Sequence, residues 1–427
     1  MYLLSTSRLS SRLVCAVIAV AALPLSLQAE PTTEADAAFS AGEFEKAREL
    51  YEGSPNGPED FAVALRLGEI ALLGNRLTDA ETHLTKARSL RPDDARPREL
   101  LAESYYRRDE FPAAAAKFAE LGRSAVADKL MNFGDAKPYF VDAPDFEVHI
   151  KFESTDPLPV LQARVNSSDP VYFILDTGGG EIIIDPTYAD TLELPRFGSE
   201  ERTYAGGKSA KNDHSRIESL RFGDWDVKNI PVNLLDTSKF SAAAAGKKIS
   251  GIVGTVFLSH FIFTLDYPRG ELVLRPRSTN VSSAMSRKAA ESRAVVQPYW
   301  MAGDHFIVTH GRMNGADRRL WFVDTGLAGG AITCPMSTIQ DAKVELPAAS
   351  FEGVGGGGTV KVTPFTVKEF AIGDAKANDL MGFFGPFPEA LENRFGFRIA
   401  GIVSHGFFRR FALTMDPESM TVSMVNP

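Results

Sequence analysis

The chain has 427 residues, a length that predicts two or three domains rather than a single core. Its formal net charge of −9 excludes the basic surface that nucleic-acid binding requires, so no nucleic acid is expected among its partners. Apolar residues make up 44% of the chain and charged residues 24%, which is the balance of a soluble globular protein.

The first 29 residues predict a secretory signal peptide. Arg8 and Arg12 give a basic start, and the apolar run over 13–25 that follows is too short to cross a bilayer comfortably. Ala29 ends the segment with a small residue of the kind found at signal cleavage sites. An uncleaved membrane anchor is the alternative interpretation of the same segment. Once residues 1–29 are removed, the sequence offers no further membrane span, so we expect an exported protein.

Residues 31–126 predict a domain of helical repeats. The segment is rich in Ala, Leu, Glu and Arg, and a pattern of small and apolar positions recurs in it every 33 or 34 residues. This pattern resembles the tetratricopeptide repeat (TPR), in which small residues lie where two antiparallel helices touch. The matching positions are Leu67, Gly68, Ala71, Ala80, Leu84, Ala87 and Pro92 in the middle unit, Leu101, Ala102, Tyr105, Ala114, Phe118 and Leu121 in the third, and Ala35, Ala38, Ala47 and Tyr51 in the first.

Two roles remain open for this TPR-like domain. Helical repeat arrays usually present a concave face to a peptide or a partner protein, so a protein partner is one expectation. A spacer or a lid on the neighbouring domain is the other. A linker is expected over 127–141, where the composition changes.

From residue 142 onward the sequence predicts a mainly-β unit made of two related halves, 142–280 and 281–427. Each half places an Asp-Thr-Gly triplet directly after an apolar strand, with Asp176 in the first half and Asp324 in the second. An Ile-Val block follows 76 residues after the first aspartate and 78 residues after the second. A glycine-rich turn and a strand that runs into a Gly-Asp turn lie between these features in both halves. Four features in the same order indicate an internal duplication.

On these residues the region 142–427 resembles the aspartic peptidases, and within them the bacterial retropepsin-like group that often carries N-terminal TPR repeats. The resemblance implies a multi-domain protein, with an all-α TPR-like helical repeat domain followed by a mainly-β, two-lobed aspartic-protease fold. Both lobes would lie in one chain, as in pepsin-like enzymes, and Asp176 and Asp324 would form the catalytic pair. The resemblance assigns support of the catalytic loops to the residues that follow the aspartates: Thr177, Gly178, Thr325 and Gly326.

Such a pair of aspartates implies an aspartic-type endopeptidase that hydrolyses peptide bonds. Two carboxylates held about 3 Å apart cannot both ionise, so they share one proton. The ionised carboxylate accepts a proton from water while the protonated one polarises the scissile carbonyl, and neither a metal nor an organic cofactor is required. The substrate would be a peptide or an unfolded protein segment, and the compartment the periplasm of a Gram-negative bacterium. The resemblance also implies flaps that close over the substrate, for which the candidates are Gly206, Gly207, Gly355 and Gly356.

Three residues depart from the family pattern. Gly179 and Leu327 follow the two triplets where the family usually has Ala or Ser, and Ser404 stands where the first half has Gly254. A bulky Leu327 beside the aspartates would narrow the cleft. Two alternatives therefore stay open: a catalytically weak or inactive peptide-binding protein of the same fold, and an assembly factor in which the TPR-like domain provides the interaction.

Overall fold

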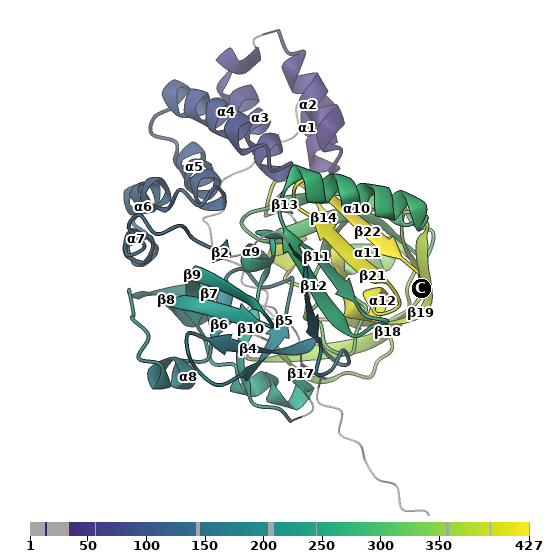
Figure 1. Cartoon of the computed structure of the whole chain (residues 1–427). Helices are drawn as coiled ribbons and strands as arrows, with labels where there is room; N and C mark the ends of the chain where they lie inside the picture. The colour runs from purple at the N-terminus through teal and green to yellow at the C-terminus, as the bar shows by residue number, and fades with distance from the viewer. Residues whose placement is uncertain are drawn as a thin grey trace, which may run out of the picture.

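The structure, a computed structural model, describes residues 13–14, 34–55, 57–141, 146–203, 209–244, 246–355, 358–392 and 394–426. The predicted signal peptide lies outside these residues, apart from the two-residue strand β1 (Leu13–Val14). In the described part, a helical region over 34–131 precedes a mainly-β region with barrel-like sheets (Figure 1). This order and these classes confirm the predicted fold class.

The helical region consists of antiparallel helix pairs. Its helices are α1 (Glu34–Ser40), α2 (Phe44–Glu52), α3 (Phe61–Leu73), α4 (Leu77–Leu90), α5 (Ala95–Arg107), α6 (Phe111–Glu120) and α7 (Ser124–Met131), with a 3₁₀ turn η1 (Gly57–Glu59) before α3. Equivalent turns between paired helices place Gly42, Asn75 and Asp109 at positive φ, +79°, +56° and +61°. Glycine and the short polar residues Asn and Asp adopt this conformation most readily. The turns therefore recur at the spacing that the sequence pattern predicted.

Local sequence accounts for where these helices begin and how closely they pack. The Asp60 carboxylate accepts hydrogen bonds from the amides of Ala62 and Val63 and so caps α3. A Cβ built on Gly68 would lie 2.6 Å from Cδ2 of Leu84, so only glycine allows α3 and α4 to approach this closely. The small residues of the repeat pattern thus mark helix contacts, as expected.

The first lobe closes into a barrel. Its strands are β2 (Phe140–Val141), β4 (Val160–Val165), β5 (Val171–Leu175), β6 (Ile182–Ile184), β7 (Ser199–Thr203), β8 (Ser209–Phe222), β9 (Trp225–Leu234) and β10 (Ile249–Val253). Among the described residues they pair in the order β2-β9-β6-β10-β5-β4-β8-β7, and a further pairing of β8 with β9 closes the circuit. Short helical segments connect them: α8 (Pro186–Thr191), η2 (Ser238–Ala244) and α9 (Thr255–Leu258).

The second lobe repeats this topology. Its strands are β14 (Phe306–Met313), β15 (Arg319–Val323), β16 (Ile332–Thr333), β17 (Phe351–Gly355), β18 (Gly358–Ile372), β19 (Ala375–Phe384) and β20 (Ile399–Val403), with α11 (Met336–Asp341), η3 (Glu389–Glu392) and α12 (His405–Phe408) between them. The order β17-β18-β19-β16-β20-β15-β14 closes through a pairing of β18 with β14. In each lobe the strand before the Asp-Thr-Gly triplet pairs in parallel with the strand of the Ile-Val block. The duplication read in the sequence is therefore a duplication of the fold.

A central sheet joins the two lobes. It is formed by β3 (Val148–Lys151), β11 (Phe261–Asp266), β12 (Glu271–Pro276), β13 (Val295–Ala302), β21 (Ala412–Asp416) and β22 (Thr421–Val425), and α10 (Thr279–Glu291) connects the lobes over it. The described strands run in the order β13-β22-β21-β11-β12-β3, which is symmetric about the β21–β11 pair. At that pair Thr264 lies opposite Thr414, and their hydroxyls are 2.9 Å apart. A pseudo-twofold axis therefore passes between these two strands.

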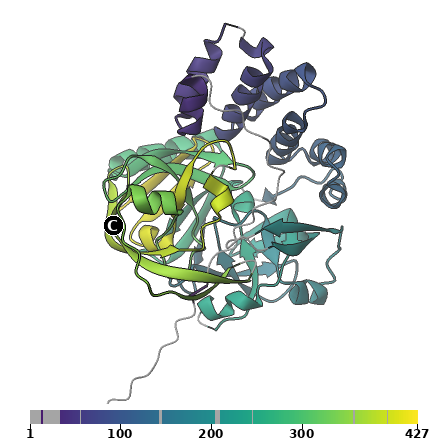
Figure 2. The same cartoon turned by 180° about the vertical axis from the view of Figure 1, so that it is seen from behind.

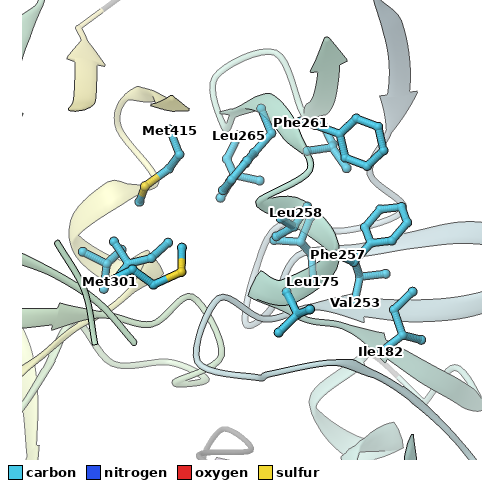
Figure 3. Close-up of a cluster of buried hydrophobic side chains, with 14 of the residues drawn as sticks. Leu175, Ile182, Val253, Phe257, Leu258, Phe261, Leu265, Met301 and Met415 are labelled. Atoms are coloured by element: carbon cyan, nitrogen blue, oxygen red, sulfur yellow. The ribbon is translucent and has the colours of Figure 1, made fainter. Parts of the chain in front are cut away.

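The main hydrophobic core crosses the lobe boundary. Figure 3 shows part of it, with β5, β10 and α9 of the first lobe contributing Leu175, Val253 and Phe257. Met301 of β13 and Met415 of β21 belong to the same cluster. Because one core serves both lobes, the strand ends that carry the two aspartates are supported as a single unit.

The helical region packs along one side of both lobes (Figures 1 and 2). Phe39 and Phe44 share a buried cluster with Trp300 and Phe397 of the second lobe, and Phe44 makes edge-to-face contacts with both. Helices α6 and α7 contribute to the core of the first lobe. The predicted linker at 127–141 is partly structured, because α7 extends to Met131 and β2 pairs with β9. Within the described residues, none of the helices combines the length and apolar character needed to cross a bilayer.

Candidate active site

Asp176 and Asp324 occupy equivalent positions at the ends of β5 and β15. The amide of Asp176 donates to the carbonyl of Val253 at 3.0 Å, and the amide of Asp324 donates to the carbonyl of Val403 at 3.0 Å. The Ile-Val blocks therefore lie beside the aspartate loops. Asp176 is 2% exposed and Asp324 is 1% exposed. The structure thus brings together two carboxyl groups that stand 148 positions apart in the sequence and buries both.

The close approach of the two aspartates depends on the glycines that follow them. A Cβ built on Gly178 would lie 2.4 Å from Cγ of Asp324, and one built on Gly326 would lie 2.4 Å from Cγ of Asp176. Each aspartate also accepts, at Oδ1, a hydrogen bond of 2.8 Å from the glycine amide of its own loop. Each carboxyl group therefore rests against the backbone of the opposite loop.

Two threonines cross-link the loops. The amide of Thr177 donates to Oγ1 of Thr325 at 3.0 Å, and the amide of Thr325 donates to Oγ1 of Thr177 at 3.0 Å. Their hydroxyls in turn donate across the lobe boundary to the carbonyls of Val323, at 3.0 Å, and Leu175, at 3.2 Å. These four bonds are buried and reciprocal, so they fix the distance between the lobes at the level of the aspartates.

Burial and the proximity of two acidic groups determine how the aspartate pair titrates. Burial raises the pKa of Asp324 well above its ordinary value, and the neighbouring charge of Asp176 and a hydrogen bond between the two carboxyl groups raise it further. The amide of Gly326 opposes this shift without reversing it. One carboxyl group of the pair therefore retains its proton at a pH where an isolated aspartate is ionised. The two groups titrate as a unit.

The residues that depart from the family pattern have structural partners. Leu327 is buried in a cluster with Val362 of β18 and Phe383 of β19, so its side chain packs against these two strands. Ser404 accepts, at Oγ, a hydrogen bond of 3.2 Å from the amide of Leu327. A glycine at 404 has no side chain to accept this bond, so the two departures support one another.

Two β-hairpins carry the predicted flap positions. The first is formed by β7 and β8, which pair up to Thr203 and Ser209, and the second by β17 and β18, which pair up to Gly355 and Gly358. The structure places Gly355 beside the tip of the second hairpin. Gly206, Gly207 and Gly356 lie outside the described residues.

Sequence reasoning missed a buried ion pair beside the first aspartate loop. Glu181, three residues after Gly178, contacts Nζ of Lys129 of α7 at 2.5 Å and accepts a hydrogen bond of 2.5 Å from Tyr106 of α5. Lys129 is 1% exposed and Glu181 7% exposed. Burial alone would raise the pKa of Glu181, but the charge and hydrogen bond of Lys129, together with His214 and Arg202, hold this pKa below its ordinary value. In the sequence, Glu181 stands out only as a charged residue that follows three glycines. No motif around Lys129 identifies it as the partner of Glu181.

Substitution of Gly178 tests how strictly the pair depends on backbone approach. We expect Gly178→Ala to push the Asp324 carboxyl group aside, with a stability loss of about 1–3 kcal/mol from overpacking. A displacement near 1 Å is enough to reduce the rate at a catalytic site by about 100-fold. Gly53→Ala is the matched control, because a Cβ there would meet its nearest atom at 3.4 Å. The melting temperatures of the two variants test this prediction, and equal losses at Gly178 and Gly53 would contradict it.

In the part of the chain that the structure describes, no group of three or more His, Cys, Asp or Glu residues is arranged to hold a metal ion. The candidate site consists of the two carboxyl groups and the backbone around them. Together these groups can bind a water molecule and exchange a proton with it.

Comparison with known proteins agrees with this geometry. Residues 161–257 match the family model described as "Aspartyl protease". The matched segment contains Asp176, its loop and the Ile-Val block of the first lobe. A search of curated proteins finds no match for the chain. The match supports an aspartyl protease family and a hydrolase of the protease kind.

Proposed function

We propose that this protein is an exported aspartic-type endopeptidase in which Asp176 and Asp324 activate the attacking water. The observation that carries the proposal is the reciprocal bonding of Thr177 and Thr325, which holds the two aspartates at equivalent strand ends. Ordinary strand-to-turn corners need no such link between lobes. The family match over the first lobe supports the same reaction class.

In the proposed reaction the aspartate pair carries one proton. The carboxylate accepts a proton from the water as its oxygen attacks the peptide carbonyl, and the protonated partner donates toward the carbonyl oxygen. The raised pKa of Asp324 supports a shared proton at mildly acidic pH. Microscopic roles are not assigned to either residue, because the pair titrates as a unit.

The two hairpins and the helical region have proposed roles of their own. We propose that the β7–β8 and β17–β18 hairpins cover an extended substrate, with Gly206, Gly207, Gly355 and Gly356 as the flap glycines. Of the two roles open to the TPR-like helices, their shared core with both lobes favours a spacer or lid over a face that binds a separate partner. A signal peptide over 1–29 would direct the chain to the periplasm or to secretion.

Hydrolysis of an unfolded protein tests this proposal. We would incubate the chain from residue 30 onward with a reduced and alkylated protein from pH 3 to pH 8 and measure newly formed α-amino groups. The expected profile is bell-shaped, because activity needs one ionised and one protonated carboxyl group. If the folded protein, verified by circular dichroism, releases no amino groups at any pH, the activity is excluded and the peptide-binding alternative replaces it.

A further inference from the structure

A cavity of about 470 Å³ lies between the inner face of the helical region and the two lobes. Its walls come from α3, α5, α6 and α7 on one side, and from the turn after β13 and the loop after η3 on the other. The lining combines apolar side chains such as Met301 and Phe395 with several charged ones. A cavity of this size accommodates a few residues of an extended peptide rather than a folded partner.

The cavity begins where the first aspartate loop ends. Glu181 lines the cavity and stands three residues after Gly178, whose backbone lies against the carboxyl group of Asp324. Three residues of extended chain span about 10 Å, so the edge of the cavity lies within about that distance of the aspartate pair. His305, which also lines the cavity, lies against the same loop, since a Cβ built on Gly180 would be 3.5 Å from its Nδ1. Two to four residues of an extended substrate span the interval between the pair and the cavity.

Arg394 is the side chain that gives the cavity a chemical preference. Its guanidinium lies over the rings of Phe395 and Phe306, at 5.1 Å and 5.4 Å from their centroids. Its Nε and Nη1 are buried and have no hydrogen-bond partner among the described residues. Burial lowers the pKa of Arg394 to about 10, although the carboxylate of Asp304 opposes the shift. A guanidinium remains protonated at that pKa near neutral pH, so it is a cation with unused donors.

Three other cations of the same lining have carboxylate partners. Arg96 contacts Glu69 at 3.0 Å, and Arg123 contacts Glu200 at 2.8 Å. Lys129 is paired with Glu181. The carboxylates near Arg394 are also engaged, since Asp304 contacts the imidazole of His305 at 2.5 Å. Buried guanidinium donors without an acceptor destabilise the folded protein. A carboxylate is the acceptor that a planar guanidinium binds best.

We infer that this cavity receives the carboxyl end of the substrate, with the terminal carboxylate on Arg394. The inference rests on the proposed peptide hydrolysis and confines cleavage to bonds near the carboxyl end of a substrate, at least two to four residues before its terminus. The apolar walls formed by Met301 and Phe395 would contact the last side chains. Because the helical region closes this side of the site, a chain that continues further does not fit.

Matched peptides test the inference. Each pair has one sequence and ends either in a free carboxylate or in an amide, and mass spectrometry identifies the released fragment. We expect the free acid to lose a short carboxyl-terminal fragment of at least two to four residues with a kcat/KM about 10- to 100-fold above that of the amide. Arg394→Gln should bring the acid down to the amide's value, Arg394→Lys should retain part of the preference, and the exposed Arg287→Gln should retain all of it. Equal kcat/KM for acid and amide in the unsubstituted protein would overturn the inference.

Binding separates this inference from the proposed reaction. With Asp324→Asn, calorimetry should show tighter binding of the acid peptide than of its amide, and Arg394→Gln in that background should remove the difference. If no peptide is hydrolysed but this binding preference is present, the reaction is excluded and the carboxylate site stands. If hydrolysis occurs without any preference for the acid, the reaction stands and the carboxylate site is excluded. Absence of both overturns both.

Discussion

Asp176→Asn and Asp324→Asn are each expected to reduce peptide hydrolysis by about 100- to 10,000-fold. Asparagine keeps the size of the side chain but can neither accept the proton of the water nor share one with its partner, and loss of general acid–base catalysis costs about 10²–10⁴ in rate. The two positions are symmetric in their backbone contacts, so the losses should be similar. Steady-state assays at the optimum pH would measure them, with the exposed Asp224→Asn as control. An activity above one tenth of the unsubstituted value in either dyad variant would contradict the proposed mechanism.

The same substitution should change how stability depends on pH. Because the folded pKa of Asp324 is raised, the native protein binds more protons than the unfolded chain between the unfolded pKa of about 3.9 and the raised folded pKa. Stability therefore falls as pH increases through that window. Asp324→Asn removes this contribution, so its melting temperature should decline less than that of the unsubstituted protein from pH 4 to pH 7. Loss of activity without loss of stability would show that the aspartate acts in the chemistry.

Lys129→Met is expected to destabilise the protein by about 3–5 kcal/mol, because it leaves the carboxylate of Glu181 buried without its cation. The loss should be largest at neutral pH and shrink in acid, where an unpaired Glu181 becomes protonated. Urea unfolding followed by tryptophan fluorescence would measure it.

A double substitution and an exposed pair provide the controls for Lys129. Lys129→Met combined with Glu181→Gln should recover most of the stability, because glutamine carries no charge and still accepts the hydrogen bond from Tyr106. Lys376 pairs with Glu369 at 3.3 Å, but their side chains are 55% and 43% exposed. Lys376→Met should therefore cost less than about 1 kcal/mol. Equal costs at Lys129 and Lys376 would show that the buried pair does not anchor the helical region.

Features that repeat in the sequence were the predictable ones. The helix pairs and the internal duplication follow patterns that occur at least twice, and the family resemblance carried by those patterns implied the two lobes and the pairing of Asp176 with Asp324. The Thr177–Thr325 link came with the family resemblance, and its geometry in the structure is reciprocal. The dyad's catalytic role, the signal peptide and the TPR assignment stay predictions.

Contacts between unlike segments were not predictable. The Lys129–Glu181 pair joins a helix to an aspartate loop that share no motif, and such a contact leaves no periodic trace. In the sequence Phe44 is an apolar residue of a helix with no sign of a distant partner, but in the structure it packs against Trp300 of the second lobe. The predicted linker at 127–141 contains part of α7 because Leu130 belongs to a core that the helical segment alone does not reveal. Tertiary packing decided these positions.

Joining both lobes in one chain has a consequence for substrate polarity. A site made by two identical chains repeats every attachment on both sides of its axis, so a helical array that closed one end would also close the other. Here the position equivalent to Glu181 in the second lobe is the apolar Ala331, whose amide donates to the carbonyl of Met381. The scaffold is therefore symmetric while its surroundings are not. A chain entering such a site meets two different ends, and this difference gives the substrate a direction that a symmetric dimer cannot impose.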